Sequence, residues 1–144
     1  LQPEPGKLLH RARGQQAGIP GFLEDYAYFI WGLLELVQTS EGQGYRDIAL
    51  RLAETVLAEF ADPEEGGFFQ TPAGAADPLV RLKKVFDDAL PSDTAVMLYN
   101  LVRLYGPGAT NTTARKHLQG VSGMVRQYPQ GALFTLFAAS FLGS

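Results

Sequence analysis

F-L-E-D-Y-A-Y-F-I-W-G-L-L-E-L-V-Q-T (residues 22–39), followed by Y-R-D-I-A-L-R-L-A-E-T-V-L-A-E-F (45–60), decides the fold class. The second stretch places apolar residues at i, i+3 and i+4 with charged residues on the other side, the pattern of an amphipathic helix. The first is apolar around nearly its whole circumference, which indicates a helix buried on all sides. Gly42 and Gly44 mark the break between them. The two stretches therefore predict a helical hairpin with one buried and one half-exposed helix.

The same alternation continues along the rest of the chain. The stretch 93–105 is almost wholly apolar, 112–127 is amphipathic and 131–142 is again apolar. This order is expected when inner helices line a ring and outer helices wrap it, whereas a plain bundle shows similar stripes on every helix. We therefore predict an all-α fold in which helical hairpins form part of an α/α toroid. Residues 1–144 then form a single domain, with helices at about 22–39, 45–60, 93–105, 112–127 and 131–142.

The segment from Ala61 to Leu90 lacks a helical period. Asp62–Gly67 is a strong turn signal. Phe68–Thr71 and Leu79–Lys83 have the composition of short strands. We predict a short β-hairpin-like insertion around 66–84, in an ordered loop over the mouth of the ring.

The composition excludes several classes of function. Of 144 residues, 46% are hydrophobic and 19% charged, which indicates a globular chain, and a net charge of −3 gives a nucleic-acid or membrane partner no support. There is no cysteine, which removes disulfides and thiolate chemistry and fits a cytoplasmic location. His10 and His117 lie far apart in the sequence, so we expect no metal site and no cofactor. An open ring would expose an apolar edge, so self-association of the chain is expected.

Two groups of polar residues are candidates for chemistry. Glu24 and Asp25 begin the buried helix 22–39, where carboxylates would face the mouth of the ring and act as proton-transfer catalysts. The alternative is that they are ordinary first-turn acids that complement the helix dipole.

The second group surrounds the start of the helix at 93. Arg81, Lys83 and Asp87 are charged residues of a loop between buried helices, which suits binding of a sugar or carboxylate ligand. Ser92 is a candidate ligand residue and, alternatively, the N-cap of the helix. Tyr26 is a candidate to position the ligand beside Asp25.

Four stretches, taken in order, carry a family resemblance. Gly21–Ala27, Asp62–Phe69, Val80–Ser92 and Asn100–Leu104 resemble the C-terminal region of the spermatogenesis-associated thioredoxin-like family. The resemblance implies a longer protein with an N-terminal thioredoxin-like domain followed by an α/α toroid. That toroid is similar to six-hairpin glycosidases and to acylglucosamine 2-epimerases, so a sugar or sugar-like ligand is implied. About five helices cannot close a twelve-helix ring, so the chain would be part of one.

The chain also departs from the family pattern. Asp93-Thr94-Ala95 follows Pro91-Ser92 where the family has Gly-Asn-Ser, and Asp88 stands where glycine is usual. These substitutions favour a second interpretation, a non-catalytic scaffold or interaction domain attached to the thioredoxin-like domain. A third is a helical-repeat surface that binds proteins, which predicts a concave face without clustered charges.

Overall fold

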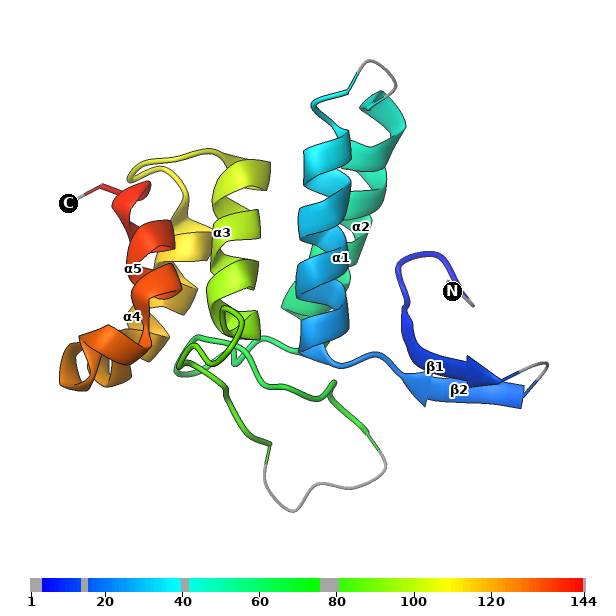
Figure 1. The fold of residues 1–144 in the computed structure, drawn as a ribbon, viewed down its shortest axis with the longest axis horizontal. Helices are drawn as coiled ribbons and strands as arrows, with labels where there is room; N and C mark the ends of the chain where they lie inside the picture. Colours follow the sequence, from blue (N-terminus) through cyan, green and yellow to red (C-terminus); the bar gives the residue numbers. More distant parts are fainter. Residues whose placement is uncertain (1–3, 14–15, 40–41, 76–80, 144) are drawn as a thin grey trace.

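A computed structural model describes residues 4–13, 16–39, 42–75 and 81–143 of the chain. In this part of the chain the fold consists of five α-helices, one 3₁₀ turn and one β-hairpin (Figure 1). The elements in order are β1 (Leu9–Arg13), β2 (Gln16–Pro20), α1 (Leu23–Leu36), α2 (Gln43–Glu59), α3 (Asp93–Tyr105), α4 (Thr112–Gln127), η1 (Pro129–Gly131) and α5 (Leu133–Ser140). Each α-helix begins and ends within about three residues of the range that the sequence predicts.

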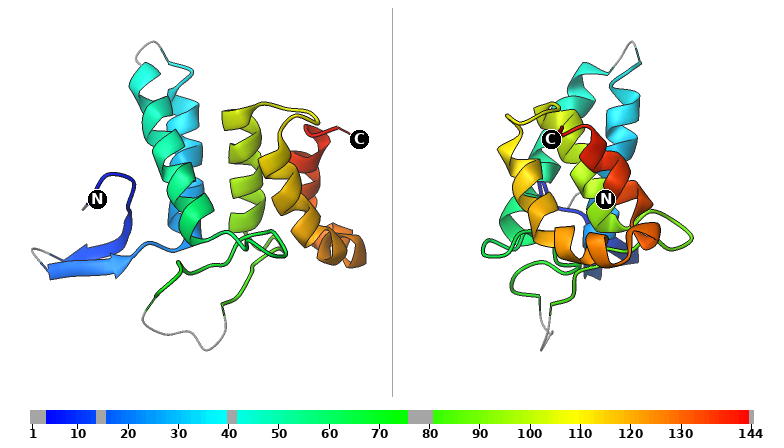
Figure 2. Two further views of the ribbon diagram at one scale, coloured as in Figure 1. Left: turned by 180° about the vertical axis from the view of Figure 1, so that it is seen from behind. Right: turned by 90° about the vertical axis from the view of Figure 1, so that its left-hand side faces the viewer.

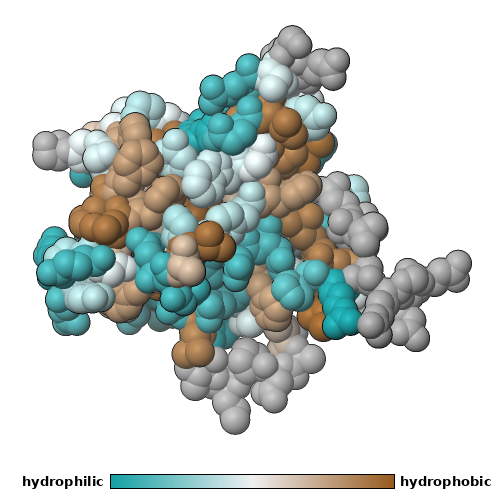
Figure 3. Space-filling view, in the orientation of Figure 1, coloured by the Kyte–Doolittle hydropathy of each residue, from teal (hydrophilic) through white to brown (hydrophobic). Residues whose placement is uncertain are grey.

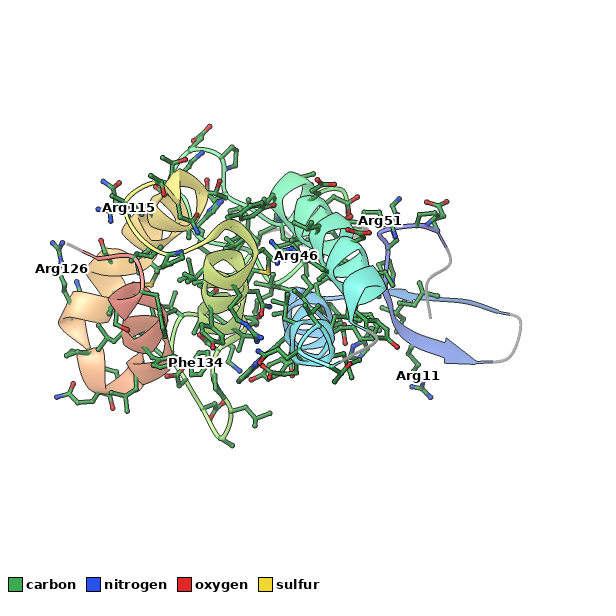
Figure 4. The ribbon with its side chains drawn as sticks, turned by 90° about the horizontal axis from the view of Figure 1, so that it is seen from above. Arg11, Arg46, Arg51, Arg115, Arg126 and Phe134 are labelled. Atoms are coloured by element: carbon green, nitrogen blue, oxygen red, sulfur yellow. The ribbon has the colours of Figure 1, made fainter. Side chains whose placement is uncertain are left out.

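The helices form two layers. α1, α3 and α5 lie side by side and run in the same direction, while α2 and α4 run back along one side of them (Figures 1 and 2). The view from above separates α2 and α4 from α1 and α5 in the same way (Figure 4). The inner helices α1, α3 and α5 therefore begin at the same end of the molecule. The long connection between α2 and α3 crosses that end.

α3 is the centre of the fold. It packs against α1, α4 and α5, and nearly every side chain along it is buried, as its apolar sequence predicts. Its first turn is fixed by Ser92, whose hydroxyl accepts a hydrogen bond from the Ala95 amide at 3.2 Å. Asn100, fully buried on α3, donates a hydrogen bond to the Ala27 carbonyl of α1 at 2.8 Å. This contact ties the two neighbouring inner helices together.

α1 and α5 are not buried all round, in contrast to the prediction. Phe29 on α1 is 48% exposed and Leu133 on α5 is 65% exposed. These helices lie at the two ends of the layer of α1, α3 and α5, and each packs against α3 and against one helix of the other layer, which leaves one side uncovered. Brown, apolar residues accordingly lie on the surface over α5 and beside α1 (Figure 3). Among the described helices, none combines the length and the apolar composition needed to cross a bilayer.

The predicted class, helices with one short β-hairpin, is confirmed, but the hairpin lies elsewhere. β1 and β2 pair antiparallel before α1, with Leu9 opposite Pro20. Among the described residues of the two segments predicted as strands, Phe68 forms an isolated bridge with Ala61, and the amide of Gln70 donates a hydrogen bond to the Leu82 carbonyl, but no strand is formed. Carbonyl groups here are bound by the side chains of Arg81 and Lys83 instead of by a strand ladder. Leu79 and Val80 lie outside the described residues.

The turn after α2 rests directly against α4. Gly66 and Gly67 have φ angles of +80° and +77°, which favour glycine. A Cβ atom on Gly120 of α4 would lie 2.3 Å from the Glu65 carbonyl oxygen, so only glycine fits at this contact. A glycine that lowers the helix propensity of α4 is therefore required by the packing of the turn.

Candidate functional site

A cavity of about 220 Å³ opens at the end of the molecule where α1 and α3 begin. Glu24 in the first turn of α1 and Asp93 at the first position of α3 line it because the two helices are parallel neighbours. The connection before α3 adds Lys84, Asp88 and the 89–91 backbone. Three carboxyl groups and one ammonium group therefore gather around one small cavity.

Asp93 is the unusual member of this group. Its side chain belongs to a residue that is only 4% exposed, and this burial raises the pKa of its carboxyl above the ordinary 3.8. The negative charge of Glu24 raises the pKa of Asp93 further, while the Thr94 amide, 2.7 Å from Oδ1, and the Lys84 charge lower it. A buried carboxyl with a raised pKa can serve as a proton donor, and the exposed Glu24 beside it as an acceptor.

Tyr28 forms a wall of the cavity one turn along α1 from Glu24. Its hydroxyl donates a hydrogen bond to the Pro91 carbonyl at 2.7 Å and so fixes the loop that precedes α3. Burial raises the pKa of Tyr28, and the negative charges of Glu24, Asp87 and Asp93 act in the same direction. The tyrosine therefore stays neutral, and since its hydrogen is donated to Pro91, its oxygen is left to accept a hydrogen bond.

An aromatic surface adjoins the acidic cavity. A second hollow of about 300 Å³ shares residues 88–91 with the cavity and is lined on its other side by Leu133, Phe134 and Phe137 of α5. Trp31 of α1 lies between Tyr28 and Phe134, with ring centroids 6.0 and 5.4 Å away. Figure 4 shows Phe134 on the side of the molecule formed by α1 and α5. Acidic groups and aromatic faces thus lie next to each other on the inner helices.

Of the two predicted catalytic acids, Glu24 lines the cavity and Asp25 does not. The Asp25 carboxylate accepts a hydrogen bond from the Phe22 amide at 2.8 Å and lies 2.9 Å from Nδ1 of His10. It thus caps α1 and holds β1 against it. Tyr26, predicted to position a ligand, is 3% exposed, and its hydroxyl accepts a hydrogen bond from the Leu8 amide at 3.0 Å. Both residues join the β-hairpin to α1.

Asp87 and Ser92 lie at the start of α3, near the cavity but turned to the backbone. Asp87 accepts hydrogen bonds from the Ser92 amide and from the Phe134 amide, each at 2.9 Å, and so bridges the beginnings of α3 and α5. Ser92 is fully buried and donates its hydroxyl hydrogen to the Val85 carbonyl at 3.0 Å. Ser92 is therefore the helix cap that the alternative interpretation expected.

Arg81 and Lys83 hold the loop after α2. The Arg81 guanidinium donates to the carbonyls of Glu59 and Thr71. Lys83 Nζ lies 2.7 Å from an Asp62 carboxylate oxygen and donates to the Gly66 carbonyl at 2.8 Å. The Lys83 contact, together with hydrogen bonds from the Glu65 and Glu64 amides, lowers the pKa of Asp62 to about 2. Neither Arg81 nor Lys83 lines the cavity at Asp93.

The structure therefore brings one predicted site residue, Glu24, together with residues that the prediction omitted. Those residues are Tyr28, Lys84, Asp88 and Asp93. Asp93 directly follows the predicted cap Ser92, and a carboxyl at the first position of an almost wholly apolar helix was the signal that could have found it. Within the described ranges, no group of three or more histidine and acidic side chains is arranged to hold a metal ion.

The fold and the site define a class of protein built from paired helices, with parallel inner helices that begin around an acidic cavity. No protein-family model matches the chain. It is similar to spermatogenesis-associated protein 20 of Homo sapiens, with 46% identity over 88 residues, and of Mus musculus, with 44% over 86 residues. The Rattus norvegicus protein is 41% identical over 87 residues. The matches cover 59–60% of this chain, and the chain spans 11% of the length of these relatives. These relatives support the family resemblance drawn from the sequence.

Proposed function

We propose that the cavity at the beginning of α1 and α3 binds a saccharide or a similar hydroxyl-rich ligand. The observation that carries this proposal is the buried Asp93 carboxyl with a raised pKa beside Glu24 and Lys84. Saccharides present hydroxyl groups that both donate and accept hydrogen bonds, and these side chains supply both functions. The adjoining rings of Trp31 and Phe134 offer apolar faces on which a sugar ring can stack.

Processing of the sugar would use the same pair of carboxyl groups. Asp93, whose carboxyl pKa is raised by burial, would donate a proton, and the exposed Glu24 beside it would accept one. Asp25 takes no part in this proposal because its oxygens face His10 and the Phe22 amide. The further parts of the proposal are the closed toroid around these inner helices, a thioredoxin-like domain in the full-length protein and a cytoplasmic location.

One set of observations favours a second function, a non-catalytic scaffold. Most of the predicted site residues are bound to backbone groups, as for Asp87 and Arg81. α1 and α5 also expose large apolar side chains at both ends of the inner layer. A scaffold that packs against further helices, or against copies of itself, needs such surfaces.

A saccharide screen distinguishes the two functions. We would titrate the protein with a panel of neutral, amino and acidic sugars by calorimetry and compare Glu24→Gln and Asp93→Asn with the parent. Glu54→Gln, an exposed acid on α2, is the control. The site predicts saturable binding that both site variants weaken and the control retains. Binding by none of the sugars, or equal binding by all variants, would favour the scaffold.

A further inference from the structure

A third cavity, of about 750 Å³, lies between the end of α2 and the beginning of α4. It shares no lining residue with the cavity at Asp93. Its polar lining includes Arg81, Lys116 and His117, and its apolar walls include Leu57 and Pro63. Ligand sites in proteins have this size and this mixture of apolar walls with a few polar groups.

Two cations line this cavity, and neither is paired with an acidic side chain among the described residues. Within the part of the chain that the structure describes, neither Arg81 nor Lys116 has a carboxylate oxygen within 4.0 Å. Arg81 uses Nε and Nη2 to bind backbone carbonyls, and Lys116 Nζ donates to the Pro63 carbonyl at 3.0 Å. A guanidinium has five N–H groups and an ammonium three, so both retain donors for a ligand.

The beginning of α4 adds to the positive potential. Thr112 and Thr113, the first two residues of this 16-residue helix, line the cavity. The helix dipole places partial positive charge there, which favours an anion. Of the two acidic residues in the lining, Asp62 is already paired with Lys83 at 2.7 Å. The remaining charges in the lining are one carboxylate, Glu59, and two cations, Arg81 and Lys116. The balance of charge therefore favours a negatively charged ligand.

His117 points to a second chemical group on that ligand. It is 4% exposed, stacks on Phe68 with centroids 4.4 Å apart, and places Nδ1 3.2 Å from the Gly67 carbonyl oxygen. A carbonyl only accepts, so Nδ1 carries the hydrogen and Nε2 presents its lone pair. Burial lowers the pKa of His117 to about 4, so its imidazole is in the neutral form near pH 7. Nε2 has no hydrogen-bond partner among the described residues, and it can accept one from a hydroxyl group.

We propose that this cavity binds a phosphate monoester of a small hydroxylated compound. The phosphate lies between Arg81, Lys116 and the first turn of α4, where charged donors and the helix dipole favour it. A hydroxyl group of the ligand donates a hydrogen bond to Nε2 of His117. The carbon skeleton lies against Leu57 and Pro63. The site is separate from the proposed saccharide site and does not depend on it.

The two histidines of the chain make a direct test possible. We would record the imidazole ¹⁵N resonances while titrating glycerol 3-phosphate, with inorganic phosphate and glycerol as parallel titrations. The expected result is a saturable shift of the His117 Nε2 resonance and no shift of His10, which pairs with Asp25 and does not line this cavity. Glycerol 3-phosphate should bind more tightly than inorganic phosphate, and glycerol should not bind.

A pair of variants on α4 locates the phosphate. Lys116→Ala should weaken binding about tenfold, the effect of one charged hydrogen bond. Arg126→Ala, which removes an exposed cation at the other end of the same helix, should leave binding unchanged. Both side chains are exposed, so the fold should be retained, and circular dichroism checks this. The proposal is overturned by an unshifted His117, by equal shifts of both histidines, by equal affinity for phosphate and ester, or by equal effects of the two variants.

Discussion

Replacement of Asp87 tests whether this loop carboxylate serves the fold or a ligand. Asp87→Ala removes two charge-assisted hydrogen bonds, to the Ser92 amide and to the Phe134 amide, each 2.9 Å long. Loss of one helix cap costs about 0.5–2 kcal/mol, and a hydrogen bond to a charged group contributes about 1.5–3 kcal/mol. Because two helix beginnings lose their acceptor together, we expect a loss of about 3 kcal/mol in the free energy of unfolding. That is a large share of the roughly 5–15 kcal/mol typical of a domain.

Urea unfolding followed by circular dichroism measures this loss. Asp87→Asn, which keeps one acceptor oxygen but no charge, should cost about half as much. Asp88→Ala is the matched control, because the neighbouring acid is exposed and should change stability by less than about 0.5 kcal/mol. Hydrogen exchange should accelerate at the Ser92 and Phe134 amides in Asp87→Ala. Unchanged stability of Asp87→Ala would refute the capping argument and return Asp87 to the list of ligand residues.

Two further predictions concern α4. Gly120→Ala should destabilise the protein by about 2 kcal/mol, because its Cβ would lie 2.3 Å from the Glu65 carbonyl oxygen. Gly123→Ala, with open space around it, should stabilise the protein by about 1 kcal/mol. Thermal unfolding of both variants measures these changes, and equal effects would contradict the close contact at Gly120. The lowered pKa of His117 means that the unfolded chain binds its proton first, near pH 6.5, and the folded chain only near pH 4. The free energy of unfolding should therefore fall as pH falls between these values, by up to about 3 kcal/mol. In His117→Asn, unfolding measured across this pH range should show a flatter dependence. An equally steep dependence in the variant would show that other groups cause it.

The helices could be predicted from the sequence because their apolar spacing is long and regular. Even the cap at Ser92 follows from a serine placed just before an apolar run. The partial exposure of α1 and α5 could not be predicted from the sequence. Apolar residues all around a helix show that every side of it can be buried, but not that a neighbouring element covers every side. The β-hairpin was misplaced because the charged and aromatic residues around 66–84 resemble strands, while their side chains bind loop carbonyls.

The candidate site could be predicted only in part. Charged loop residues such as Lys83 and Asp87 look alike in a sequence whether they bind a ligand or the protein itself. In this fold Lys83 binds Asp62 and the Gly66 carbonyl, and Asp87 binds two backbone amides. Glu24 was found because it begins a buried helix. Asp93 was missed because its importance depends on α1 and α3 lying parallel, which brings Glu24 and Asp93, 69 residues apart in the sequence, to one cavity.

The most direct test of the proposed site is a ¹³C-detected titration of the Asp93 carboxyl, in the parent chain and in Glu24→Gln. The account predicts a midpoint above the ordinary 3.8 in the parent, because the carboxyl is buried and faces Glu24, and a lower midpoint in the variant. A midpoint at or below 3.8 that is the same in both proteins would show that the two carboxyl groups do not form an acid–base pair, and would contradict the account.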